Sequence, residues 1–171
     1  MRHISKTLLV VVFAGGMIFI GCINVFFDYT NRTEFCVSCH SMQQNHEEYK
    51  KTVHYKNASG VQASCADCHV PKSFFPKVYA KIAAASDVYH ELVGTISTPE
   101  KFEDRKMYLA EKVWDKMKAN DSRECRACHS FDNMKLEAQA ELAGKKHARA
   151  GTGETYKTCI ECHTGIAHTE P

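Results

Sequence analysis

The chain has 171 residues, a formal net charge of +2 and 44% hydrophobic residues, enough for one membrane segment and one modest domain. The near balance of basic and acidic side chains excludes the strongly basic surface typical of nucleic-acid binding, so we expect no nucleic-acid partner. Nine cysteines are unusual for this length. They indicate metal or redox sites in a reducing compartment, or disulfides and attached cofactors outside it.

The first predicted element is a membrane helix. Residues 7–27 carry no charged side chain. A helix of this length reaches roughly 32 Å, and the hydrocarbon core of a bilayer is about 30 Å thick. Arg2 and Lys6 come just before it. Basic residues on this side predict residues 1–6 in the cytoplasm and residues 28–171 on the outer side of the membrane.

Two other interpretations of this segment compete with a membrane helix. A cleaved signal peptide would need a shorter apolar run and a small-residue cleavage site, which we do not find. A lipid anchor on Cys22, which follows Gly21, is the second. Gly15, Gly16 and Gly21 would let two such helices approach closely, as the helices of a homodimer do.

Eight of the nine cysteines form four copies of the pattern C-x-x-C-H. The cysteines are Cys36, Cys39, Cys65, Cys68, Cys125, Cys128, Cys159 and Cys162, and the histidines that follow them are His40, His69, His129 and His163. This pattern is the attachment signature of c-type haem, in which two thiols bind the porphyrin and the histidine reaches the iron. A zinc site would not require a histidine after every pair of cysteines. The sequence therefore predicts four covalently bound haem c groups.

Electron-transfer haems usually take a second strong axial ligand, and three histidines are candidates for it. His54 lies between the first two motifs, His147 between the last two, and His168 after the fourth. This order predicts two di-haem units, at residues 36–69 and 125–168. The spacing does not say which histidine serves which haem, and three candidates leave one haem short.

The first motif continues as Cys39-His40-Ser41-Met42, which leaves its own axial ligand open. The thioether of Met42 could compete with His40 or replace it at the iron. A methionine in this position is more often a packing residue, so the residues alone do not decide between the two.

Two helices are predicted between the di-haem units, over about residues 75–118. The first runs from Phe75 to Val93, with apolar residues at helical spacing, and the second begins at Thr98-Pro99 and ends near Lys118. We therefore expect a mainly α fold, with a single N-terminal transmembrane helix and a small multihaem cytochrome c domain. The haem groups are expected to form much of its core.

The chain resembles the NapC/NirT family of membrane-anchored tetrahaem cytochromes c. The resemblance is carried by the apolar N-terminus, the four motifs and the segments YKKTVHYKN, CADCHVP, ASDVYHEL and KTCIECHTGIAH. It implies a protein that oxidises membrane quinol and passes electrons to a periplasmic reductase or a cytochrome c acceptor in anaerobic respiration. It also implies that Met42 ligates the first haem. His54, His147 and His168 would be distal ligands, and Lys81 and Asp87 would lie at a quinol site beside the first haem.

Two other functions remain as alternatives. One is a membrane-tethered haem wire that has no quinol site and receives electrons from another redox protein. The other is a terminal reductase that acts on a small oxyanion at an open haem position, although no additional pocket motif supports it. Without the resemblance, Lys81 and Asp87 would be read as a solvated helix face. Neither the choice between menaquinol and ubiquinol nor the terminal acceptor follows from the residues.

Overall fold

The computed structural model describes residues 5–171, and within this range every regular element is a helix. The elements are α1 (Lys6–Thr30), α2 (Thr33–Cys36), α3 (His40–Tyr49), α4 (Cys65–His69), α5 (Phe74–Leu92), α6 (Pro99–Ala119), α7 (Arg123–Arg126), η1 (Phe131–Asn133), η2 (Leu136–Ala138), α8 (Glu141–Gly151) and η3 (Cys159–Glu161). The predicted mainly α fold is therefore confirmed.

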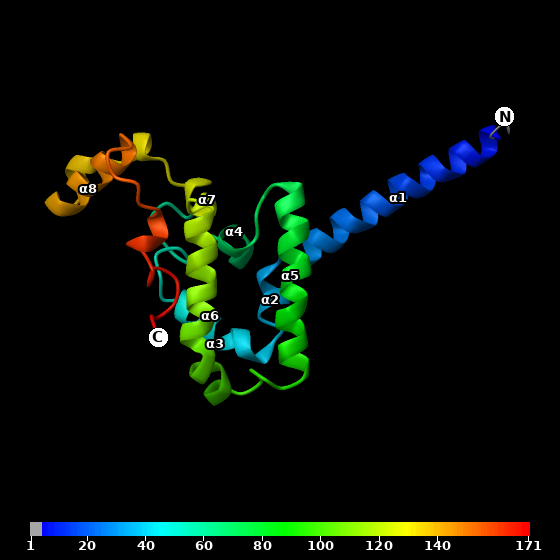
Figure 1. Cartoon of the computed structure of the whole chain (residues 1–171), viewed down its shortest axis with the longest axis horizontal. Coiled ribbons are helices and arrows are strands. Elements are labelled where there is room, and N and C mark those ends of the chain that lie inside the picture. The colour runs from blue at the N-terminus through cyan, green and yellow to red at the C-terminus, as the bar shows by residue number, and fades with distance from the viewer. Residues whose placement is uncertain (1–4) are drawn as a thin grey trace.

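Helix α1 projects from the rest of the molecule as an isolated arm (Figure 1). Within residues 5–171 it is the one helix long and apolar enough to cross a membrane, and its side chains are nearly all exposed. An apolar helix surface exposed on all sides is suited to lipid rather than water. The helix contains the predicted segment 7–27 and continues to Thr30. Arg2, on which the predicted orientation partly rests, lies outside the described residues.

The last turn of α1 contacts α5 through an aromatic pair and a hydrogen bond. The rings of Phe27 and Phe74 lie 6.4 Å apart between their centroids. The Lys81 ammonium donates a hydrogen bond of 2.9 Å to the backbone carbonyl of Thr30, which is a buried residue. The last carbonyls of a helix have no partner inside it, and a lysine there satisfies one and also complements the helix dipole. The end of the apolar arm is therefore held in a fixed position against α5.

Helices α5 and α6 match the two helices predicted for residues 75–118 to within one residue. The hydroxyl of Thr98 accepts a hydrogen bond of 3.3 Å from the Lys101 amide, and Pro99 occupies the first turn, as the sequence predicts. A short loop joins the two helices (Figure 1), and α3 packs against α6 while α2 packs against α1 and α4.

The second and fourth motifs both begin with a capping box. Ser64 caps α4 by accepting from the Asp67 amide at 3.2 Å, while the Asp67 carboxylate accepts from the Ser64 amide at 2.9 Å. Thr158 and Glu161 form the equivalent capping box at η3, with 2.6 Å from the Thr158 amide to the carboxylate. In both cases the acid is the residue before the second cysteine. The capping box therefore fixes the turn that presents both thiols.

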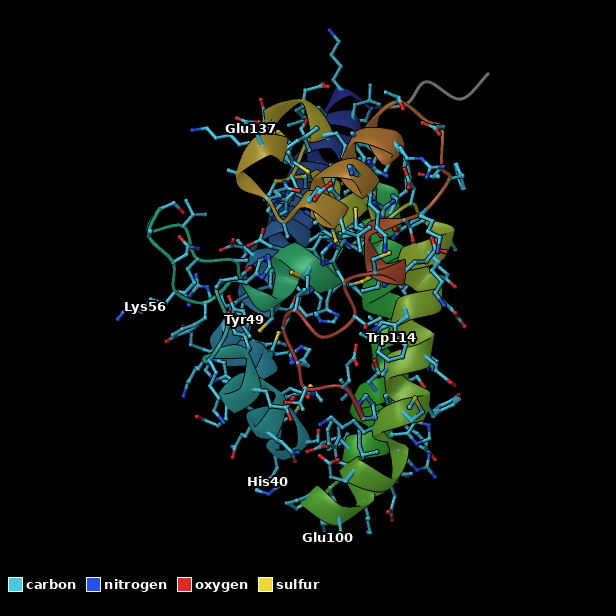
Figure 2. All side chains as sticks on the ribbon, turned by 90° about the vertical axis from the view of Figure 1, so that its left-hand side faces the viewer. His40, Tyr49, Lys56, Glu100, Trp114 and Glu137 are labelled. Atoms are coloured by element: carbon cyan, nitrogen blue, oxygen red, sulfur yellow. The ribbon has the colours of Figure 1, made fainter. Side chains whose placement is uncertain are left out.

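Few apolar side chains are buried among the described residues. They are Tyr49, Ile96, Phe102 and Ile160. In the view of Figure 2, His40 and Glu100 lie near one end of the molecule and Glu137 lies near the other. At that other end α8 packs tightly on η2, because a Cβ at Gly144 would lie 2.7 Å from the Leu136 carbonyl oxygen.

Candidate haem and electron-entry sites

The six histidines outside the first motif that were predicted as ligands lie in three pairs. Ring centroids are 6.1 Å apart for His54 and His129, 6.2 Å for His69 and His168, and 6.0 Å for His147 and His163. Each pair combines the histidine of one motif with one of the three predicted distal histidines. The pairs differ in orientation, with interplanar angles of 79°, 34° and 19° respectively.

These separations fit one haem iron between each pair. An imidazole nitrogen lies about 2 Å from a bound metal, so two axial rings on opposite sides have centroids roughly 6 Å apart. The Nδ1 atoms of His54 and His168 are buried without a hydrogen-bond partner among the described residues. Burial also lowers the pKa of His168, which favours the neutral imidazole that a metal requires. The residues present therefore fit bis-histidine haem c at the second, third and fourth motifs.

Two of the pairs join the two predicted di-haem units. His54 lies between the first two motifs but faces His129 of the third, and His168 lies beyond the fourth motif but faces His69 of the second. Only His147 and His163 pair within one unit. The two units are therefore interlocked rather than side by side, which the order of residues along the chain did not reveal.

Two contacts that the sequence did not predict orient distal histidines. The Tyr49 hydroxyl donates to the backbone carbonyl of His54 at 3.0 Å and also to that of Ala63. His147 Nδ1 lies 2.6 Å from Gln139 Oε1. Because an amide oxygen can only accept, the His147 Nδ1–H donates and Nε2 remains free for iron.

The four motifs follow one another in space in chain order. Helix α2, which ends at Cys36, packs on α4, which begins at Cys65, and α4 packs on α7, which contains Cys125. The Ser122 hydroxyl, just before α7, accepts a hydrogen bond from the Ile160 amide inside the fourth motif. Burial raises the pKa of Cys68, and the nearby Cys125 raises it further. Burial likewise raises the pKa of Cys125, with a further contribution from Cys159. Each motif therefore lies beside the next, from the first to the fourth.

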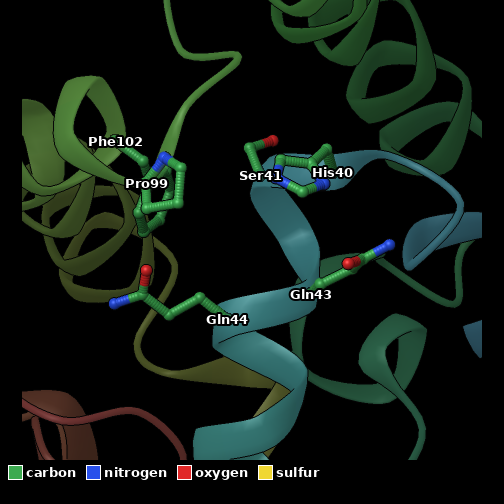
Figure 3. A pocket seen from close by; sticks show the side chains of 6 residues that line it. All are labelled: His40, Ser41, Gln43, Gln44, Pro99 and Phe102. Atoms are coloured by element: carbon green, nitrogen blue, oxygen red, sulfur yellow. The ribbon is translucent and has the colours of Figure 1, made fainter.

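The first motif differs from the other three. Glu91 of α5 fixes its end, because one carboxylate oxygen accepts from the His40 amide at 3.1 Å and from the Ser41 amide at 3.5 Å. The His40 ring is exposed and lines a cavity of about 150 Å³ with Pro99 and Phe102, which lie across from it (Figure 3). Met42 is half-buried two residues further along α3. Since positions i and i+2 of a helix point in different directions, the two side chains do not face the same point.

The structure places Lys81 and Asp87, the two residues of the predicted quinol site, on α5 but does not bring them together. The Lys81 ammonium donates a hydrogen bond to the Thr30 carbonyl at the end of α1, and it lies close enough to Cys36 for their charges to interact. Partial burial lowers the pKa of Lys81. Asp87 is exposed and forms no ion pair among the described residues. Helix α5 thus runs from the end of the apolar arm to the Glu91 contact at the first motif.

The apolar arm, the four motifs and the facing histidines define a membrane-anchored multihaem c-type cytochrome. The profile of the NapC/NirT cytochrome c family, N-terminal region, matches residues 1–171. The chain therefore belongs to the NapC/NirT cytochrome c family, as its motifs predict.

Relatives of known name agree with this assignment. A protein of Allochromatium vinosum, whose name describes a tetraheme c-type cytochrome, is 53% identical over 99% of this chain and 91% of its own length. The cytochrome c-type protein NapC of Escherichia coli K12 is 45% identical over 96% of this chain and 82% of its own. The denitrification system component NirT of Stutzerimonas stutzeri is 45% identical over 99% and 84%.

A solved structure shares the fold. It is a chain of the cytochrome c nitrite reductase NrfHA complex bound to the HQNO inhibitor, with a TM-score of 0.53 and 24% identity. The match covers 96% of this chain and 93% of that one.

Proposed function

We propose that the chain carries four haem c groups and transfers electrons from membrane quinol to a periplasmic acceptor. The haems, when bound, supply one-electron acceptance and donation. The three histidine pairs at 6.0–6.2 Å support ligation of the second haem by His69 and His168, the third by His54 and His129, and the fourth by His147 and His163. Each motif lies next to the one that follows it in the chain, which supports a single electron path from the first haem to the fourth.

For the first haem we propose Met42 as the axial ligand rather than His40. His40 lies at the exposed start of α3 and lines the cavity formed with Pro99 and Phe102. Met42 lies two positions further along the same helix, hence on a different side of it, and is half-buried. A thioether ligand would give this haem a higher potential than its bis-histidine neighbours.

The observation that carries quinol oxidation is the place of Lys81. Its ammonium donates to the Thr30 carbonyl at the end of the apolar arm and is close enough to Cys36 of the first motif for their charges to interact. A quinol in the bilayer would therefore meet this side chain where the membrane ends and the haem region begins. There the ammonium can donate a hydrogen bond to a quinol oxygen and hold it beside the first motif.

Oxidation of a quinol to a quinone releases two electrons and two protons, so the protons need an acceptor. Asp87 lies on α5 between Lys81 and Glu91, and its carboxylate is exposed and free of ion pairs among the described residues. It can take a proton and pass it to water. Transfer of protons to the periplasm is expected because residues 28–171 are proposed to lie on that side of the inner membrane.

The test uses the full-length, haem-loaded protein in liposomes with a menaquinol analogue as the sole electron donor. Rapid-mixing absorbance follows haem reduction. Because a hydrogen bond from a charged group contributes about 1.5–3 kcal/mol, Lys81→Ala is expected to slow reduction by quinol about 10- to 160-fold. Reduction by dithionite, which needs no binding site, is expected to keep its rate.

Lys77→Ala is the matched control, because Lys77 lies one turn earlier on α5 and no hydrogen bond joins it to α1 in the described residues. It is expected to leave both rates unchanged. Equal slowing of both donors by Lys81→Ala would remove the quinol role. If the unaltered protein is reduced by dithionite but not by any quinol, the chain is a haem wire fed by another redox protein.

A further inference from the structure

The largely buried carboxylate of Glu48 connects helix α3, helix α6 and the C-terminal segment that follows His168. Glu48 of α3 accepts a hydrogen bond of 3.0 Å from the Lys106 ammonium of α6 through one oxygen. Its other oxygen accepts from the backbone amide of Thr169 at 2.8 Å. The Glu48 and Lys106 side chains are only 14% and 11% exposed. We call Glu48, Lys106 and the Thr169 amide the C-terminal clamp.

An ion pair with this little exposure is better suited to fixing a geometry than to adding stability. Removing two charges from water costs several kcal/mol, and their attraction recovers this only when every polar atom is satisfied. Here both carboxylate oxygens have partners, and Lys106 also lies 3.5 Å from the more exposed Glu103. Although burial by itself raises the pKa of Glu48, the bonds from Lys106 and Thr169 lower it, so the carboxylate stays ionised.

The C-terminal clamp holds the residue next to a predicted haem ligand. Thr169 is the residue after His168, whose ring faces His69 of the second motif at 6.2 Å. Residues 164–171 form no helix, so the segment has no regular backbone pattern to hold it. The bond from the Thr169 amide to Glu48 fixes the backbone next to the histidine.

We propose that Glu48 is a positioning residue for His168 and thereby for the distal ligation of the second haem, an inference that rests on the proposed His69–His168 pairing. Lys106 holds the Glu48 carboxylate, and the carboxylate holds the Thr169 amide. When the clamp is broken, His168 leaves the iron for part of the time, and the second haem becomes accessible to small ligands.

The test measures carbon monoxide bound per chain by the dithionite-reduced, full-length, haem-loaded protein. A haem that loses its sixth ligand binds this gas, whereas a bis-histidine haem does not. His168→Gly sets the reference and is expected to add one carbon monoxide per chain to the wild-type value. Glu48→Gln is expected to bind more carbon monoxide per chain than the wild type, toward the value of His168→Gly. Added imidazole should return the low-spin spectrum of Glu48→Gln. Glu103→Gln, which removes the exposed partner of Lys106, should stay at the wild-type value.

A second pair of variants keeps the test decisive if Glu48→Gln fails to accumulate. Thr169→Pro removes the amide donor and leaves the ion pair intact, whereas Thr169→Ala keeps the donor. Only the proline variant is expected to bind additional carbon monoxide. If His168→Gly adds carbon monoxide but neither Glu48→Gln nor Thr169→Pro does, the clamp has no positioning role and the pairing stands. If His168→Gly adds none, the pairing itself is wrong.

Discussion

Ser122 offers a stability test with a magnitude that follows from the structure. It is the fully buried residue that precedes α7 and the third motif, at 0% exposure, and its backbone is left-handed at φ 48°. Its hydroxyl accepts a hydrogen bond of 3.1 Å from the Ile160 amide, inside the fourth motif. Ser122→Ala keeps the Cβ and the backbone but leaves the Ile160 N–H buried without a partner. A buried group in that state costs about 1–3 kcal/mol.

For a chain of this size, each kcal/mol lowers the melting temperature by about 2–4 °C, so Ser122→Ala is expected to lose roughly 2–12 °C. Thermal unfolding of the haem-loaded protein, followed by Soret absorbance, measures the loss. Ser130→Ala is the control, since that exposed hydroxyl also accepts a backbone bond, from the Asp132 amide at 3.3 Å, but water can replace it. Ser122→Gly should lose less than alanine, because glycine adopts positive φ without strain. Equal shifts for Ser122→Ala and Ser130→Ala would refute the reasoning.

Two further predictions concern single hydrogen bonds near the motifs. Gln139→Leu is expected to raise the potential of the fourth haem alone, because the bond to Nδ1 makes His147 more basic and favours ferric iron; a redox titration that shifts every haem equally would contradict this. The hydrogen bonds from the Ser64 amide and hydroxyl lower the pKa of Asp67, and the Lys72 ion pair lowers it further. Its carboxylate therefore stabilises the fold above the unfolded pKa of about 3.9, and this contribution is lost as the pH falls through the native pKa. Asp67→Asn should thus destabilise the protein at neutral pH, with a difference that shrinks in acid unfolding curves; a difference independent of pH would contradict the pKa shift.

The parts of the molecule that the sequence predicted are those set by local patterns. The apolar run of α1, the periodicity of α5 and the cap at Thr98 depend on neighbouring residues, and all three are confirmed. The four C-x-x-C-H motifs are equally local. Family membership also followed from short segments, because these motifs and their flanks are specific.

The pairing of the histidines could not be predicted, because it depends on contacts between distant segments. His54 is closest along the chain to the first two motifs, yet the fold brings it to His129. The hydrogen bond from Lys81 to the Thr30 carbonyl could not be predicted either, since every residue has a backbone carbonyl and the sequence does not show which one accepts. Acid residues inside the second and fourth motifs could have indicated capping boxes, because Ser or Thr stands three residues before each.

The same histidine pairs bear on how such a sparse fold holds together. Tyr49, Ile96, Phe102 and Ile160 make up its buried apolar side chains among the described residues, which is few for a region of this length. If each facing pair binds one iron, the His54 and His168 pairs tie the first unit to the second. Covalent attachment then supplies both the apolar bulk and the long-range links that a hydrophobic core supplies elsewhere. Loss of either interlocking pair should therefore loosen both units, whereas loss of the His147–His163 pair should affect only α8 and the fourth motif.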